Sequence, residues 1–438
     1  MKLIKKIEAR WLLLFAALLM PTVQIQAIVP TPAAVQDNAV AITGATIHTG
    51  NGDVIENGVI TFSEGKITAV GGPAVNVTDH DVINMAGNHL YPGFILPNTV
   101  LGLIEVTSVR ATQDVLEEGE LNPNVRAIVA YNTDSELIPA LRFNGILTAQ
   151  ITPRGTLVGG FSSVVQLDGW NWEDAAYAVD DGIHLYWPAM YQPSFDVTTR
   201  TVTVKKNVNY EKLVASLTAL FQNASVYAGE SGLNLKLGAV KKLIDGTTRL
   251  YIHANGAREI ISAIRFSERL NVKRVVLVGG REALSVKDLL LEHDIPVIVD
   301  QVHGLPDSED ADIDQTFKRP AQLIEAGLKV GLGTNGRMES DRNLPFMAGT
   351  AVAYGMDREA ALTMITRSNA EILGIADRVG TLEAGKDATL FVCKGDALDM
   401  RGNQLLRAFI QGRAIDLNGT QQQLFERYRE KYSKQASQ

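Results

Sequence analysis

The sequence predicts an α/β fold: a (β/α)8 barrel of the TIM type, with a small β-sandwich domain formed from both ends of the chain. Strands alternate with amphipathic helices over residues 91–376, a rhythm typical of parallel sheets and long enough for a barrel with insertions. Short β-rich segments at 37–90 and 377–420 flank it, which indicates one domain split in the sequence. A doubly wound open sheet is the alternative, and the lack of G-x-G-x-x-G after the first strand disfavours it.

The first 27 residues have the layout of a secretory signal peptide. A lysine-rich start precedes the ten-residue apolar run WLLLFAALLM, and Ala27 ends an acceptable cleavage site. The run is shorter than the roughly 20 residues that a spanning helix needs, so an uncleaved anchor is the less favoured alternative. We therefore expect an exported protein, periplasmic or secreted, without stable membrane insertion.

Composition narrows the classes of partner. The chain has 41 Lys+Arg and 49 Asp+Glu residues, a formal net charge of −8, which argues against a nucleic-acid binder. The single cysteine, Cys393, excludes an intrachain disulfide framework and a cysteine-rich zinc site. A small-molecule ligand is the expected partner, and a homo-oligomer remains open.

The spacing of apolar residues and the turn signals predict where the individual strands and helices lie. In the first β-segment, strands are expected at 39–46, 59–63 and 66–70. In the barrel, strands are expected at 249–253, 272–278, 295–300 and 328–334, and helices at 256–270, 281–293, 316–326, 344–354 and 358–373. Strands at 388–393 and 405–412 return to the β-domain, and 421–438 is a polar tail expected to be a surface helix. Residues 160–245 give no confident strand assignment.

Several stretches resemble the amidohydrolase superfamily. They are 90–95 (LYPGFI), 380–388 (GTLEAGKDA) and 410–413 (IQGR), which in that family lead into the barrel and form the returning β-domain. Other stretches, at 135–138 (SELI), 150–154 and 167–170 (LDGW), are similar to its exported imidazolonepropionase-like branch. The likeness covers roughly residues 40–415.

The resemblance implies a hydrolase of non-peptide carbon–nitrogen bonds that uses a divalent metal, zinc by resemblance. It implies an H-x-H pair after strand one, a lysine or glutamate on strand four, histidines ending strands five and six, and an aspartate ending strand eight. Imidazole and carboxylate hold the cation, which lowers the pKa of its water to about 7. Barrel sites lie at the carboxyl ends of the strands.

This sequence departs from that pattern at most positions. Asn98 and Val100 replace the two histidines of strand one, Gly279 stands at the strand-six position, and Asn335 replaces the strand-eight aspartate. His253 alone keeps its place, at the end of strand five. An amide is a poor zinc ligand and takes no proton from water. The sequence thus predicts a degenerate site with His253 and Asn98 as remaining ligands, and either no metal or a weakly bound one.

Other residues are expected around the same mouth. The candidate catalytic residues are His253, Asn335 and Asp341; the candidate substrate-binding residues are Arg154, Asp300 and His303. Asp341 can replace the missing aspartate only if its loop folds back. Gln150 and Arg154 are expected near the end of strand three or four, and the remaining histidines, His184 among them, at surfaces or turns.

Two functions stay open from the sequence. The first is an amidohydrolase acting on cyclic amides or dipeptide-like substrates through an unusual site. The second is a catalytically silent barrel that binds a ligand or serves as partner subunit of an active homologue. The loss of both strand-one histidines and of the strand-eight aspartate favours the second.

Overall fold

The structure is a computed structural model that describes residues 32–228, 232–306, 310–336 and 338–436. The expected signal peptide, residues 1–27, lies outside these ranges. Within the described part of the chain, no helix combines the length and the apolar composition that crossing a membrane requires.

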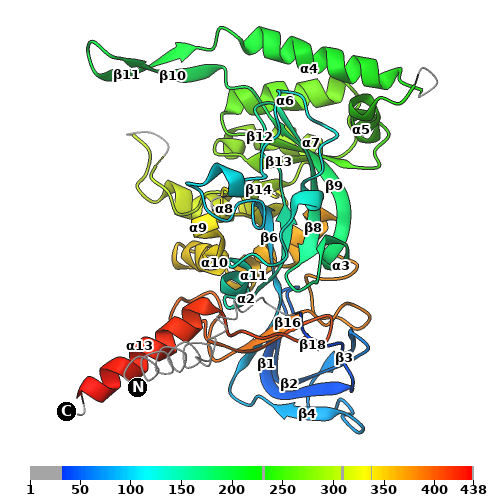
Figure 1. Cartoon of the computed structure of the whole chain (residues 1–438), viewed down its shortest axis with the longest axis vertical. Coiled ribbons are helices and arrows are strands. Elements are labelled where there is room, and N and C mark those ends of the chain that lie inside the picture. Colours follow the sequence, from blue (N-terminus) through cyan, green and yellow to red (C-terminus); the bar gives the residue numbers. More distant parts are fainter. Residues whose placement is uncertain (1–31, 229–231, 307–309, 337, 437–438) are drawn as a thin grey trace, which may run out of the picture. The chain divides into compact units, whose positions relative to one another are not determined.

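Eight strands form a nearly closed, TIM-like barrel sheet (Figure 1). In order around the sheet they are β6 (Phe94–Thr99), β7 (Ile146–Ile151), β8 (Val158–Gln166), β9 (Ala176–Tyr186), β12 (Arg249–Ala254), β13 (Val275–Gly279), β14 (Val297–Val299) and β15 (Val330–Leu332). β6 pairs parallel with β7, and β9 through β15 pair parallel in succession. β8, the third strand, runs antiparallel to both neighbours.

A side chain bridges the first and the last strand. In the described residues no backbone hydrogen bond links β6 to β15. Instead Asn369, fully buried, donates from Nδ2 to the carbonyls of Ile95 (2.8 Å) and Leu332 (2.9 Å) and accepts from the Leu332 N–H (3.2 Å). Its amide thus serves backbone groups that a strand pair would otherwise satisfy.

Helices cover the barrel where the apolar period of the sequence indicates. In α6 (Ala257–Arg269) the buried residues Ile260, Ala263, Ile264 and Ser267 follow the spacing of one helix face. The others are α2 (Ile138–Arg142), α3 (Trp172–Ala175), α4 (Tyr210–Ser225), α5 (Leu235–Ile244), α7 (Lys287–Glu292), α8 (Gln315–Glu325), α9 (Met338–Asp341), α10 (Leu344–Ala353), α11 (Arg358–Ile365), α12 (Arg367–Leu373) and α13 (Thr420–Ala436).

A second sheet joins both ends of the chain. Its strands are β1 (Val40–His48), β2 (Val54–Ser63), β3 (Lys66–Gly71), β4 (Asp81–Asn84), β5 (His89–Pro92), β16 (Leu390–Cys393), β17 (Leu405–Ile410) and β18 (Arg413–Ala414). β5 pairs with β16, so blue and orange strands lie side by side in Figure 1. All eight strands belong to one sheet, and a separate β-sandwich domain stays a prediction.

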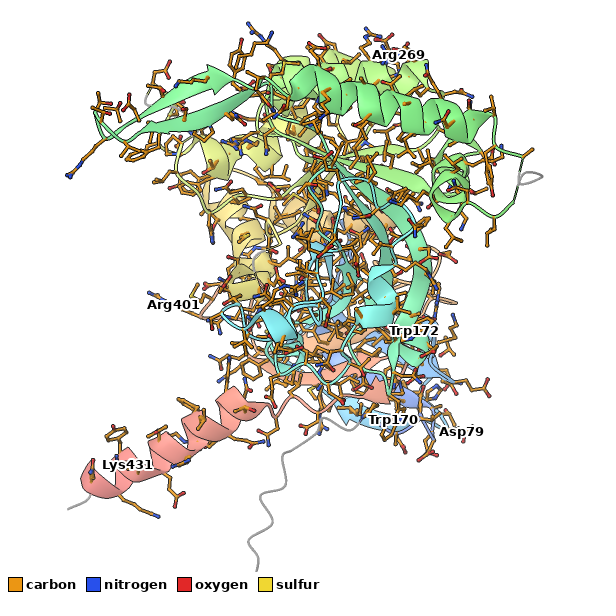
Figure 2. The ribbon with its side chains drawn as sticks, turned by 45° about the horizontal axis from the view of Figure 1, so that its top comes forward. Asp79, Trp170, Trp172, Arg269, Arg401 and Lys431 are labelled. Carbon is orange, nitrogen blue, oxygen red and sulfur yellow. The ribbon has the colours of Figure 1, made fainter. Side chains whose placement is uncertain are left out.

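The segment that the sequence left unassigned holds the reversed strand. β8 is buried at every position and includes two adjacent glycines, so it shows no alternation of polar and apolar residues. Because β7 runs parallel to β6 and β8 runs back, the short turn between β7 and β8, residues 152–157, lies at the mouth of the barrel. The β8–β9 connection, marked by Trp170 and Trp172 in Figure 2, lies at the opposite end. A hairpin, β10 (Tyr191–Asp196) and β11 (Thr201–Lys206), follows β9.

Candidate functional site

A network of buried polar side chains fills the barrel below its mouth. Asp181, on β9, accepts hydrogen bonds from Gln150 Nε2 (2.8 Å), Ser162 Oγ (2.8 Å) and Tyr251 Oη (2.7 Å). All four residues are buried. Burial raises the pKa of Asp181, and the three hydrogen bonds act in the opposite direction. Gln150 Oε1 accepts from the Asn98 N–H (3.1 Å), which carries the network up to the first strand. The network fixes the positions of the side chains above it.

Arg154 lies between the strand ends where the predicted ligands of strands one and eight would converge. Its Nη1 donates to Asn98 Oδ1 (3.0 Å) and to Tyr186 Oη (3.3 Å). On the other side, a Cβ atom at Gly336 would lie 1.3 Å from Arg154 Nη2, so the guanidinium touches the backbone directly after Asn335. The hydrogen-bond partners of this guanidinium in the described chain are all neutral.

Local backbone geometry presents Asn98 to that guanidinium. The pairing of β6 with β7 shifts register between Leu96 and Thr99, and Asn98 has a φ of 55°. Such a bulge re-aims a side chain. Asn98 therefore turns Oδ1 to Arg154 and is 1% exposed.

His253 is partly exposed and forms a pair with a second histidine. Its Nε2 lies 2.8 Å from Nδ1 of the fully buried His184, so one proton is shared between the two rings. Burial, with the Arg154 charge acting the same way, holds the pKa of His253 well below its usual value. The pKa of His184 is lowered likewise by burial, His253 and Arg154. Both imidazoles are therefore neutral at pH 7, and the ring of Tyr186 stacks on His253 at 4.2 Å.

Asp341 does fold back to the strand ends. Its carboxylate accepts hydrogen bonds from the hydroxyls of Thr99, at the end of β6, and Thr334, just after β15. It is 1% exposed, and burial raises its pKa to about 6, opposed by the two hydroxyls and by Arg154. Asp341 thus places a carboxyl group between the ends of the first and the last strand of the barrel sheet.

The raised pKa of Asp341 predicts a specific pH dependence of stability. Between pH 4 and pH 6 the folded chain keeps a proton that the unfolded chain releases, so this group's contribution to stability falls as pH rises. Compared with wild type, Asp341→Asn should gain roughly 3 kcal/mol in relative free energy of unfolding between about pH 4 and pH 8. Urea unfolding of both proteins across this range measures the difference. The control, Glu339→Gln, removes an exposed charge that adds only slightly to the raised pKa of Asp341, so it should give a much smaller difference. A flat difference for Asp341→Asn would contradict the prediction.

The other predicted residues scatter around the mouth. Asp300 follows β14 and is partly exposed; burial raises its pKa, and Arg154 and Arg281 oppose the rise. His303 instead pairs with Thr350 Oγ1 (2.7 Å) on α10, beside a different cavity. Asn335 is exposed with a φ of 60°. The structure thus brings together Arg154, Asn98 and His253. The Arg154 charge also acts on the carboxyl groups of Asp300 and Asp341. His303 and the Asn335 side chain lie apart from this group.

A cavity of about 360 Å³ opens at the ends of β12 and β13. His253 lines it together with Trp187, which has no hydrogen-bond partner for its buried Nε1. The cavity also receives charged side chains of both signs. These are Glu259, which accepts from the Met190 N–H (3.1 Å), Glu282, which accepts from the Ala257 N–H (2.7 Å), and Arg281. The volume falls in the range of small-molecule sites.

The side chains present do not fit a divalent metal. Asn98 already gives Oδ1 to a cation of the protein, and His253 faces His184. Val100 and Gly279 have no ligating side-chain atom, and across the described residues no group of three or more His, Cys, Asp or Glu side chains could hold a metal ion. The predicted metal ligands His253 and Asn98 therefore do not form a site with a third donor.

Two features of the site were missed or misplaced from the sequence. His184 was expected at a surface or turn; this was wrong, because it ends up fully buried on β9. Gln150 lies on β7, the second strand, with Arg154 in the turn that follows, and not at strand three or four. The spacing of His184 and Tyr186, alternate residues of one strand, is the signal that could have placed both near the mouth.

Comparison with known proteins agrees with this architecture. A model described as "Amidohydrolase family" matches residues 240–417. An amidohydrolase structure from Thermotoga maritima MSB8 is 23% identical, covers 86% of this chain and 99% of its own, and has a TM-score of 0.76. The family match covers less than half of the chain, and the structural match shows a shared fold. No curated protein matches the chain.

Two other solved structures share the fold alone. A prolidase complexed with N-methylphosphonate-L-proline is 15% identical, with 86% of this chain and 99% of its own covered and a TM-score of 0.53. A Xaa-Pro dipeptidase with bound methionine in its active site is 15% identical, with 86% and 100% covered and a TM-score of 0.54.

Proposed function

We propose that this chain is an exported amidohydrolase-type barrel that binds a small dipeptide-like molecule at its mouth without metal-dependent hydrolysis. One observation carries the proposal: the guanidinium of Arg154 fills the space in which the family's strand-one and strand-eight ligands would hold a cation. A positive side chain there repels a divalent metal and leaves the rest of the mouth intact for a ligand.

The cavity supports a ligand that carries both charges. Glu259 and Glu282 offer carboxylates for an ammonium group, and Arg281 adds a positive charge to the same lining. Trp187 adds an apolar wall with one N–H donor still to be satisfied. Two barrels of the same fold hold a proline phosphonate and methionine, which makes amino-acid-derived ligands the first class to examine.

Metal content and ligand binding test the proposal together. We expect the mature protein, grown with zinc, manganese and iron, to contain far less than one metal per chain, unchanged by His253→Ala. Calorimetric titration with Ala-Pro and Met-Pro should show binding that Glu282→Gln weakens by at least about tenfold, a loss of about 1.4 kcal/mol. A stoichiometric metal lost on His253→Ala would overturn the metal-independent part, and no binding of any dipeptide would overturn the ligand class.

Hydrolysis is the second candidate, because Asp341 supplies a carboxyl group with a pKa of about 6 near the strand ends. Its burial and its two hydroxyl partners argue against contact with substrate. Amine release from the same dipeptides, abolished by Asp341→Asn, would establish this candidate. The partner-subunit role predicts a complex with an active homologue and stays a prediction, as does the imidazolonepropionase-like branch.

A further inference from the structure

The β10–β11 hairpin has one apolar face and one polar face. Its register pairs Pro193 with Val204 and Phe195 with Val202, so these four side chains share a face, continued at its base by Tyr191 and its partner Lys206. The opposite face carries only polar residues: Gln192, Ser194, Asp196, Thr201, Thr203 and Lys205. Apart from Lys206, the residues alternate between apolar and polar, which is typical of a sheet with one face packed on another surface.

Nothing in the described chain covers the apolar face. Phe195 is 60% exposed, Val202 66% and Val204 72%. In Figures 1 and 2 the green hairpin projects beyond the barrel with no other element over it. A lone two-stranded hairpin is marginally stable in water. Its apolar face therefore calls for a partner surface.

The charge of the hairpin indicates the kind of surface. Arg200, Lys205 and Lys206 stand against the single carboxylate of Asp196, whereas the whole chain has a net charge of −8. The hairpin is thus a cationic arm on an acidic protein. A surface that combines exposed apolar side chains with carboxylates would match both properties.

The loop that follows β6 offers such a surface. Val106, Val109 and Leu116 are 44–49% exposed. The same loop carries the exposed carboxylates Asp114, Glu117, Glu118 and Glu120, with Arg110 as its one exposed cation. It lies at the barrel mouth, because the Arg154 N–H donates to the Val115 carbonyl (2.7 Å). We call residues 105–120 the mouth loop.

We propose that the hairpin of each chain docks its apolar face on the mouth loop of a second copy, forming an arm-exchanged dimer. The hairpin follows β9 and the loop follows β6, so both lie at the same end of the barrel. A two-fold axis that brings one arm to the partner's loop therefore brings the partner's arm back to the first loop.

The buried area favours this arrangement over simple stacking of the two hairpins. A ribbon of two six-residue strands is about 20 Å long and 10 Å wide. With its side chains it presents roughly 400 Å² of accessible surface. Two arms on two loops bury roughly 1,600 Å², a standard stable interface. Stacking hairpin on hairpin buries half of that and brings like charges together.

Oligomeric state tests the proposal. Light scattering with size exclusion, over low to high micromolar concentrations, should show a dimer for the mature chain. Phe195→Asp with Val202→Asp should give a monomer, whereas the matched polar-face variant, Ser194→Asp with Thr203→Asp, should stay dimeric. A monomeric wild type, or a dimer that survives the apolar-face change with an unchanged dissociation constant, would overturn it.

Two further variants identify the surfaces in contact. Lys205→Glu with Lys206→Glu should weaken the dimer by at least about tenfold, and adding Glu117→Lys with Glu118→Lys should restore it. Val204→Cys with Leu116→Cys introduces reactive thiols in a chain whose one native cysteine is buried. Oxidation should give a covalent dimer. A disulfide formed within one chain would show that the arm closes on its own mouth and would overturn the proposal.

Discussion

A chain carrying Asn98→His, Val100→His, Asn335→Asp and Arg154→Ala will bind about one zinc ion per chain, whereas the same three ligand changes with Arg154 retained will bind none. The ligand changes restore the family pattern at strands one and eight and add to His253. The fourth change removes the guanidinium that contacts Asn98 and the backbone of Gly336, next to Asn335.

Electrostatics makes the contrast large. A divalent cation about 4 Å from a guanidinium, at an effective dielectric constant near 20, is repelled by roughly 8 kcal/mol. Even a fraction of this repulsion exceeds the metal-binding free energy that two added imidazoles of imperfect geometry supply. We therefore expect the guanidinium and the metal to be alternative occupants of one position.

Mass-spectrometric metal analysis and calorimetric zinc titration of the two variants provide the measurement. The single Arg154→Ala variant is the control for the loss of the arginine alone and should remain metal-poor, because it has too few ligands. Equal zinc binding with and without Arg154 would show that the guanidinium does not occupy the metal position.

Asp181→Ala is expected to be the most destabilising single substitution at the site. It removes the one acceptor of the buried Tyr251 hydroxyl and one hydrogen bond each from Gln150 and Ser162. Gln150 Nε2 can still donate to Ser162 Oγ (3.2 Å), and Ser162 Oγ to the Gly182 carbonyl (3.2 Å). One unsatisfied buried donor costs about 1–3 kcal/mol and the two other lost hydrogen bonds about 1 kcal/mol each, so the loss should reach roughly 3–5 kcal/mol. In a chain of 438 residues this lowers the melting temperature by roughly 3–6 °C.

The adjacent aspartate gives a matched comparison. Asp180 pairs with Arg126 at a partly exposed position, and Asp180→Asn should cost less than about 1 kcal/mol. Asn is chosen because Asp180 has a φ of 55°, which alanine tolerates less well. Calorimetric melting of both variants measures the two losses of stability. A loss below about 1 kcal/mol in the free energy of unfolding for Asp181→Ala would mean that the barrel network relaxes around the gap.

The sequence predicted the second half of the barrel closely. The expected helix 256–270 is α6, and the expected strand 249–253 is β12 with His253 at its end. These elements can be predicted from the sequence because their apolar residues recur at a regular period and glycine or charged residues flank them. Strand one was equally well placed by its flanking motif.

The first half resisted prediction for physical reasons. Every residue of β8 is buried, so the strand carries polar residues that are satisfied inside the barrel and shows no period. His184 is buried by pairing with His253, a residue 69 positions away that no local pattern reveals. Arg154 could be named as a mouth residue but not placed, since its position depends on the reversal of β8.

That reversal also bears on how the barrel assembles. Parallel neighbours need a long crossover, but β7, β8 and β9 are joined by the short connections 152–157 and 167–175 and pair as a meander. Contacts between residues close in sequence form with the least loss of chain entropy. We expect the meander to form early and the seam between β6 and β15, whose strands lie more than 200 residues apart, to close last. The turn that bears Arg154 would then be in place before the two strand ends that it separates arrive.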